Sequence, residues 1–255
     1  MPLLNLPASS IDDVIGQLDI IIEWAKENES KLGYFPALYR KVTWRVKDGI
    51  IRNEFEDSAR MEKFDVIFAN RYLTAFEKYH NQHDPVRAWD HAFDAAHRWK
   101  PIILQHLMLG MNAHINLDLG IAAAETVDAL GDSLLDMKHD FFLITDILIE
   151  MIDHVQNEIS QVWPLMRLLD RIAGEKDELI AAFGLDVSRN RAWKTARALA
   201  NLSDARRDHT IGKLDRNVRN LGKLLLSNGP IFGVLLFIAR LGEMRSVSGT
   251  IEVLE

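Results

Sequence analysis

The sequence contains no cysteine among its 255 residues. Disulfides, thiolate nucleophiles and cysteine-ligated zinc or iron–sulfur centres are therefore excluded. Basic residues are also in the minority, because 30 Lys and Arg stand against 37 Asp and Glu and give a net charge of −7. A chain of this charge has no overall positive field that would attract a polyanion, so we expect no nucleic-acid partner.

Long apolar runs and the common catalytic motifs are missing as well. The longest apolar stretch, Pro230–Ala239, is too short to span a bilayer, and no strongly basic face adjoins it, so we expect no membrane partner. The N-terminus, MPLLNLPASSIDD, lacks the basic start and apolar core of a signal peptide, which predicts a cytoplasmic protein. No HExxH, P-loop, GxGxxG or GxSxG supports zinc-protease, nucleotide or serine-hydrolase chemistry.

What the sequence has is helical periodicity along almost its whole length. Ser10 and Asp13 form a capping-box start, and Asp84 followed by Pro85 predicts the start of a later helix. No internal repeat or linker divides the chain. The sequence predicts one all-α, bundle-like domain over residues 1–255, with a minor division near 185 as the alternative. We expect helices at roughly 14–25, 35–49, 57–80, 85–96, 101–130, 138–160, 162–173, 189–202, 205–226 and 230–241.

The segment HLMLGMNAHINLDLG, residues 106–120, combines core-type side chains with strongly polar ones. Asn112, His114, Asn116 and Asp118 alternate with apolar residues, which is typical of a strand. A helix is favoured because the surrounding run is rich in Ala, Leu and Met, and because a lone strand would lack a pairing partner. A helix that is apolar nearly all round is buried. We therefore expect a central buried helix at about 101–130, packed against the helix at 57–80.

The polar residues of this helix allow two interpretations. At helical spacing His114 and Asp118 share one stripe, with His106 near its edge, while Asn112 and Asn116 lie on nearly the opposite one. A buried polar group without a partner costs about 1–3 kcal/mol, so each of these side chains needs one. They either hydrogen-bond neighbouring helices and fix the packing, or face a pocket as acid/base groups or metal ligands.

The helix at 57–80 raises the same question, because several of its charges lie with or beside the apolar stripe. Such charges are costly unless they are paired. Internal ion pairs are one interpretation, with Arg40 and Arg45 of the preceding helix as candidate partners. The other is a charged lining of a cavity, in which arginine holds an anionic substrate group. The charges concerned are Asp57, Arg60, Asp65 and Arg71.

Other motifs carry less weight. Glu77-Lys-Tyr-His80 is the only Glu-x-x-His, and the polar run after it predicts exposure rather than an inward-facing metal ligand. The His-Asp dipeptides at 83–84 and 139–140 are expected by chance in an acidic chain with nine histidines. Asp140 nevertheless lies near an apolar stripe, which suggests a link to the core.

Three blocks, YFPALYRKVTWRV, FEDSARMEKFDVIFANRYLTA and LQHLMLGMNAHINLDLGIAAA, resemble a bacterial family known only as a domain of unknown function. The resemblance extends through most of the chain, to RAWKTARALANL, and LGMNAHINLDL is its most specific part. It brings no activity with it, but it implies that the polar residues picked out by burial belong to shared blocks. Those residues are Arg40, Asp57, Arg60, Asp65, Arg71, His106, Asn112, His114, Asn116 and Asp118.

Two functional hypotheses follow. The first is an enzyme with a polar cavity, in which His106, His114 and Asp118 are catalytic or bind a divalent metal and a small anionic molecule is the substrate. The second is a non-catalytic ligand- or protein-binding domain whose buried polar residues are structural; exposed apolar helices would favour a homodimer. The substrate-binding residues of the first hypothesis are Arg60, Arg71, Asn112, Asn116, Asp57 and Asp65.

Overall fold

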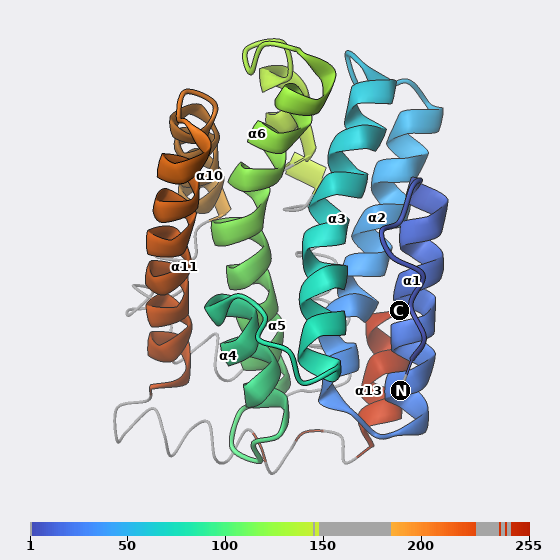
Figure 1. The fold of residues 1–255 in the computed structure, drawn as a ribbon. Coiled ribbons are helices and arrows are strands. Elements are labelled where there is room, and N and C mark those ends of the chain that lie inside the picture. The colour runs from blue at the N-terminus through green and yellow to red at the C-terminus, as the bar shows by residue number, and fades with distance from the viewer. Residues whose placement is uncertain (1, 145, 148–184, 228–239, 241–242, 244–245) are drawn as a thin grey trace, which may run out of the picture.

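The computed structural model describes residues 2–144, 146–147, 185–227, 240, 243 and 246–255 (Figure 1). Within these ranges the chain is helical and has no strand, which confirms the all-α prediction. The predicted helix at 162–173, and most of those at 138–160 and 230–241, lie outside the described residues. The described elements are α1 (Ile11–Glu27), a 3-10 turn (Lys31–Gly33), α2 (Tyr34–Ile51), α3 (Ser58–His80), α4 (Arg87–Ala96), α5 (Ile103–Met111), the π-helix η2 (Asn112–Asp118), α6 (Leu119–Leu130), α10 (Leu185–Leu199), α11 (Asp204–Leu226) and α13 (Val247–Leu254).

A long central column organises the bundle. It consists of α5, η2 and α6, which follow one another without a break from residue 103 to residue 130. Helices α1, α2 and α3 lie on one side of it, and α10 and α11 lie on the other (Figure 1). The column packs against α3, as predicted, and its side chains Leu117, Leu119 and Ala122 have no exposed surface. The predicted central buried helix is therefore confirmed.

Two glycines allow the column to approach its neighbours closely. A Cβ atom added to Gly110 would lie 2.4 Å from the ring of Phe35 on α2. A Cβ atom added to Gly120 would lie 2.5 Å from the backbone carbonyl of Ala192 on α10. Both distances are far below van der Waals contact, so any larger residue at either position would push two helices apart.

Side-chain caps fix the starts of two helices. The predicted capping box opens α1, because Ser10 Oγ accepts a hydrogen bond from Asp13 N at 3.1 Å and the Asp13 carboxylate accepts one from Ser10 N at 3.2 Å. Asp57 caps α3 by accepting a hydrogen bond from Arg60 N at 2.9 Å. These local rules act as expected, since each cap satisfies amide groups that the first turn leaves unpaired.

The predicted cap of α4 is wrong. The helix begins at Arg87 with Val86 at the N-cap position, and not after Asp84. Its first amide groups donate instead to Asp215 of α11, from Arg87 N at 3.1 Å and Ala88 N at 2.8 Å. A carboxylate from a distant helix therefore replaces the local cap, which no rule based on neighbouring residues could anticipate.

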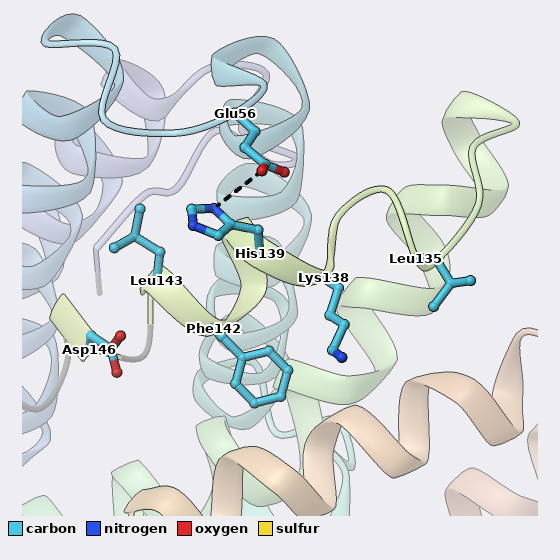
Figure 2. A pocket seen from close by; sticks show the side chains of 7 residues that line it. All are labelled: Glu56, Leu135, Lys138, His139, Phe142, Leu143 and Asp146. Carbon is cyan, nitrogen blue, oxygen red and sulfur yellow. Dashed lines mark ion pairs between the residues drawn. The ribbon is translucent and has the colours of Figure 1, made fainter.

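A short helical segment follows the turns at 131–137. Residues 138–144 are helical and bring His139 opposite Glu56, two residues before α3 begins (Figure 2). Phe141 anchors the segment, because its fully buried ring lies 6.1 Å from that of Phe64 on α3. None of the described helices is both long enough and apolar enough to cross a membrane.

Candidate functional site

The polar residues of the central column lie on a π-helix. Residues Asn112–Asp118 adopt this wider turn in place of the regular α-helix that the sequence predicts. A π-helix bonds each amide to the carbonyl five residues earlier, which shifts the faces of the helix before it relative to those after it. Segments of this kind occur frequently at functional sites. The π-helix therefore directs attention to the side chains that it presents to α2 and α3.

His114 projects from the π-helix into an aromatic enclosure. His114 is 3% exposed, and its ring stacks on that of Phe68 of α3 with the ring centres 3.6 Å apart. The ring of Tyr39 meets it edge-on at 4.5 Å. Neither imidazole nitrogen has a hydrogen-bond partner. Burial lowers the pKa of His114, and the nearby Asp118 carboxylate opposes this only in part, so the ring is neutral at neutral pH.

Asp65 of α3 is the second buried polar group without a full set of partners. It is 2% exposed, and its Oδ2 atom accepts no hydrogen bond. The predicted ion pairs to it do not form, because Arg40 pairs with Asp19 and Arg45 pairs with Glu54. Burial, with a smaller contribution from the charge of Glu62 on the same helix, raises the pKa of Asp65 to about 7.

Two tyrosine hydroxyls share this situation. Tyr39 and Tyr72 are buried, and neither hydroxyl has a hydrogen-bond partner. The hydrogen bond between Thr43 and Tyr39 joins the Thr43 hydroxyl to the backbone carbonyl of Tyr39, at 3.0 Å, and not to the Tyr39 hydroxyl. Burial raises the pKa of both tyrosines well above the ordinary value, so both remain protonated. We call Tyr39, Asp65, Tyr72 and His114 the inner cluster.

Asp118 connects the inner cluster to the surface. Its Oδ2 atom accepts a hydrogen bond from Trp89 Nε1 at 2.7 Å and lies 3.8 Å from His114 Nδ1, which is too far for a hydrogen bond. Its Oδ1 atom accepts one from Arg71 Nε at 2.9 Å, and Arg71 also donates to Glu125 at 3.0 Å. Arg71 of α3 therefore joins two carboxylates of the column, those of Asp118 and Glu125.

A surface pocket ends at this ion pair. It has a volume of about 350 Å³, and we call it the outer pocket. Asp118 and Arg71 line it together with side chains of α3, including Thr74 and Lys78, and with Glu125 of α6. The Asp118 carboxylate thus stands between an open polar pocket and the closed inner cluster.

The other predicted residues of the column lie elsewhere. Asn112 Nδ2 donates to the carbonyl of Val218 on α11 at 2.9 Å, and Asn116 Nδ2 donates to Asn112 Oδ1 at 3.1 Å. Gln105 Nε2 also hydrogen-bonds to α11, because it donates to the carbonyl of Leu225 at 2.8 Å. This face of the column therefore holds α11 in place, as the structural interpretation predicts, and it does not line the inner cluster or the outer pocket.

His106 does not join His114. Its ring packs against Tyr34 with the ring centres 5.8 Å apart, and burial lowers its pKa to about 3. The predicted metal set of His106, His114 and Asp118 is not assembled. Among the described residues, the only three His, Asp or Glu side chains whose ligand atoms lie within 4.8 Å of one another are Glu56, His139 and Asp140.

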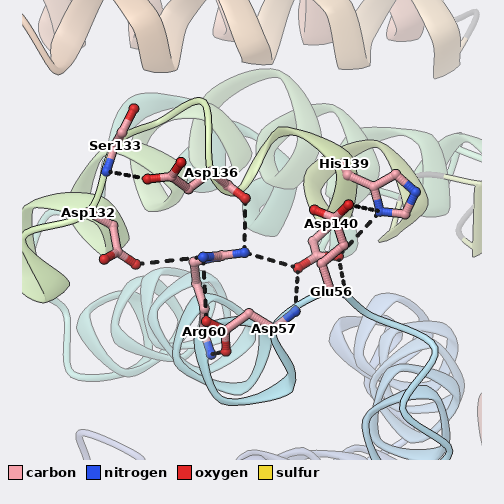
Figure 3. Close-up of polar contacts among 8 residues, drawn as sticks. All are labelled: Glu56, Asp57, Arg60, Asp132, Ser133, Asp136, His139 and Asp140. Atoms are coloured by element: carbon pink, nitrogen blue, oxygen red, sulfur yellow. Dashed lines mark hydrogen bonds and ion pairs between the residues drawn. The ribbon is translucent and has the colours of Figure 1, made fainter.

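Asp57 and Arg60 belong to a separate ion-pair network at the start of α3 (Figure 3). The Arg60 guanidinium donates to the carbonyl of Asp136 at 2.9 Å and to Asp140 Oδ2 at 3.4 Å. It also lies 3.4 Å from Asp57 and 3.8 Å from Asp132. The internal ion pairing expected for these two residues is therefore present, and it ties α3 to the segment 132–140.

Sequence reasoning overlooked Tyr39, Tyr72 and Trp89. Each fits the apolar stripe of its helix, and nothing in the local sequence tells a tyrosine with a satisfied hydroxyl from one without a partner. Only the packing of α2, α3 and α4 against the column brings these side chains beside His114.

Comparison with known proteins places the chain in a family. A family model described as a family of unknown function, DUF5995, matches residues 11–228. No curated protein and no solved structure matches the chain. The matched range includes the whole inner cluster and the outer pocket. The chain therefore belongs to this family of unknown function.

Proposed function

We propose that the protein is an enzyme that binds a small polar molecule at the inner cluster and transfers protons with His114 and Asp65. The observation that carries the proposal is a set of five buried atoms without hydrogen-bond partners: the hydroxyls of Tyr39 and Tyr72, Asp65 Oδ2 and both nitrogens of His114. The rings of Tyr39, Tyr72 and His114 are neighbours, and the charge of Asp65 helps to raise the pKa of Tyr39. Buried polar atoms in native proteins are almost always paired, and each unpaired one costs about 1–3 kcal/mol. A bound molecule that hydrogen-bonds these atoms would offset that cost.

The pKa shifts support opposite roles for the two groups. Burial keeps His114 neutral, so its imidazole is able to accept a proton as a general base. Burial raises the pKa of Asp65 to about 7, so its carboxyl still holds a proton near neutral pH and is able to donate it. Tyr39 and Tyr72 stay protonated and would donate hydrogen bonds to oxygen atoms of the substrate.

Asp118 suits a positioning role. Once His114 accepts a proton, the carboxylate 3.8 Å from its Nδ1 atom becomes the counter-ion of an imidazolium. The outer pocket is the natural entrance, since it reaches Asp118 and Arg71 directly. Arg71 is already paired with two carboxylates, Asp118 and Glu125, so its charge is not available to an anionic substrate. The proposed substrate is therefore a molecule with hydrogen-bonding groups and without a strong negative charge.

A non-catalytic binding protein is the second candidate. The Arg60 network and the contacts of Asn112 with α11 favour it, because they show that much of the predicted polar set is paired and structural. Under this hypothesis the inner cluster would hold a ligand without changing it. The two candidates therefore differ in turnover and agree on where the small molecule binds.

A stability measurement tests the site itself. We expect Tyr72→Phe to raise the free energy of unfolding by about 1 kcal/mol, because it removes a buried hydroxyl without a partner. Tyr79→Phe is the matched control, since the Tyr79 hydroxyl is bonded to Asp94 at 3.1 Å and its loss should give no gain. Destabilisation by Tyr72→Phe would show that the hydroxyl is satisfied and would count against the proposal.

Turnover is tested with a panel of small hydroxy, keto and amino compounds incubated in deuterated buffer and followed by NMR. We expect the wild-type protein to exchange or convert at least one compound, and His114→Gln and Asp65→Asn to lower that rate at least about 100-fold. The rate should fall as the pH rises through about 7, because Asp65 then loses its proton. Binding of a compound without conversion would support the second candidate.

A further inference from the structure

Three potential metal ligands meet at the start of α3, away from the inner cluster. Glu56 precedes the Asp57 cap, and His139 and Asp140 lie on the helical segment 138–144. His139 Nδ1 is 3.5 Å from Asp140 Oδ1 and 3.9 Å from Glu56 Oε1. Figure 2 shows the imidazole and the Glu56 carboxylate turned toward one another. We propose that Glu56, His139 and Asp140 bind a divalent transition-metal ion.

The separations fit such an ion. Nitrogen and oxygen ligands lie about 2.0–2.2 Å from a tetrahedral Zn²⁺, which places them about 3.3–3.6 Å from one another. The spacing of His139 and Asp140 is already in this range. Glu56 Oε1 is 3.9 Å from His139 Nδ1, a few tenths of an ångström beyond this range, and all three ligand atoms lie within 4.8 Å of one another. The Glu56 side chain is 57% exposed, so it is free to move closer.

Hydrogen bonds from neighbouring groups fix the position of the Asp140 carboxylate, as they do for many metal-binding carboxylates. It has no exposed surface. Its Oδ1 atom accepts a hydrogen bond from Glu56 N at 2.8 Å, and its Oδ2 atom accepts from Asp57 N at 3.1 Å and from Arg60 at 3.4 Å. A carboxylate has about four acceptor positions, so one remains, on the Oδ1 atom that is the nearer to His139. Fixing a ligand by outer hydrogen bonds is a general property of metal sites.

The local charge also favours a cation. Arg60 is the one cation drawn into the network, and the carboxylates of Asp57, Asp132 and Asp140 surround it (Figure 3). Glu56 adds a further negative charge beside His139. The guanidinium of Arg60 and the ammonium of Lys138, which lines the adjoining pocket, do not balance four carboxylates, so a divalent ion would relieve the excess. An imidazole ligand beside two carboxylates favours Zn²⁺ or Co²⁺ over Mg²⁺ or Ca²⁺.

The proposed site opens onto a pocket of about 560 Å³. Glu56 and His139 line this pocket together with Lys138, Phe142 and Leu143 (Figure 2). Three protein ligands leave a tetrahedral ion one position for water or for a ligand in the pocket, which is the arrangement of exchangeable rather than closed structural sites. The inference does not depend on the function proposed for the inner cluster.

The test is a calorimetric titration of Zn²⁺ into the untagged full-length chain after chelator treatment, with Co²⁺ as the spectroscopic probe. We expect one ion per chain, an absorption spectrum of low-coordinate Co²⁺, and a loss of affinity of at least about tenfold in His139→Ala and Glu56→Gln. His209→Ala is the matched control, because His209 is an exposed histidine on α11. Asp140 is left unchanged, since its loss would also disrupt the Arg60 network.

Two results would overturn the proposal. One is the absence of stoichiometric Zn²⁺ binding to folded wild-type protein. The other is binding of equal strength in wild type and His139→Ala, which would place the ion at another group. Circular dichroism of each variant establishes that it is folded. A loss of Zn²⁺ affinity in folded His139→Ala, with no loss in His209→Ala, then identifies His139 as a metal ligand.

Discussion

Asp65 gives the sharpest prediction, because its burial links the stability of the protein to pH. The folded-state pKa is about 7 and the ordinary value is 3.8. Below pH 3.8 the carboxyl is protonated in both states, and the folded state has no disadvantage. As the pH rises toward 7, the Asp65 carboxyl ionises in the unfolded chain but keeps its proton in the folded chain. The free energy of unfolding therefore falls, until the folded carboxyl ionises too.

The size of the loss follows from the shift. From 3.8 to about 7 is a difference of about 3 units, and each unit corresponds to 1.36 kcal/mol, so the full loss is about 4 kcal/mol. Because Asp65 is 2% exposed, solvent screening reduces this little. Asp65→Asn keeps the shape of the side chain and removes the ionisation. We expect the variant to be more stable than the wild type, increasingly so as the pH rises.

Urea unfolding at about pH 5 and pH 8 measures the effect. More than half of the roughly 4 kcal/mol falls in this interval, and it appears as the difference between wild type and Asp65→Asn rather than as the pH dependence of either protein alone. Asp208→Asn, a change at an exposed position of α11, controls for the loss of a carboxylate in general. Parallel pH profiles of wild type and Asp65→Asn would refute the reasoning and mean that Asp65 is solvated or paired.

Two further substitutions test the column and its ion pair. Gly110→Ala should destabilise the protein by about 1–3 kcal/mol in thermal or urea unfolding, because the new Cβ would lie 2.4 Å from the Phe35 ring; an unchanged stability would mean that α2 and α5 separate freely. Asp118→Asn should cost about 3 kcal/mol, since it leaves Arg71 with Glu125 alone; unfolding measurements in high salt should show most of the same loss, because the Asp118 carboxylate itself is only 1% exposed.

The fold was largely predictable because its determinants are periodic. The column at 103–130 and helix α3 follow from apolar residues repeated at helical spacing, and the start of α1 follows from a local capping box. The cap of α4 was not predictable, because Asp215 supplies it from α11, far along the chain. The π-helix was not predictable either, since one extra residue per turn leaves no mark in the polar pattern that separates it from an α-helix.

The candidate site was predictable only as a set of positions. Burial logic identified His114, Asp65 and Asp118 as polar groups in apolar surroundings, and all three are buried. It could not decide which of them have partners, because a partner comes from another helix. Arg40 illustrates the limit: its spacing makes it a candidate for Asp65, but its side chain faces α1 and pairs with Asp19.

Helix α3 carries two buried charged side chains that differ in their partners. Arg60 and Asp65 are both buried, less than two turns apart on the same helix. Arg60 meets three carboxylates and a carbonyl, and its charge is compensated. None of the ion pairs among the described residues includes Asp65, and its Oδ2 atom has no hydrogen-bond partner there, so nothing in this part of the chain offsets the cost of burying it. Pairing rather than burial therefore distinguishes the two groups, and for this reason the proposed function rests on Asp65 and not on Arg60.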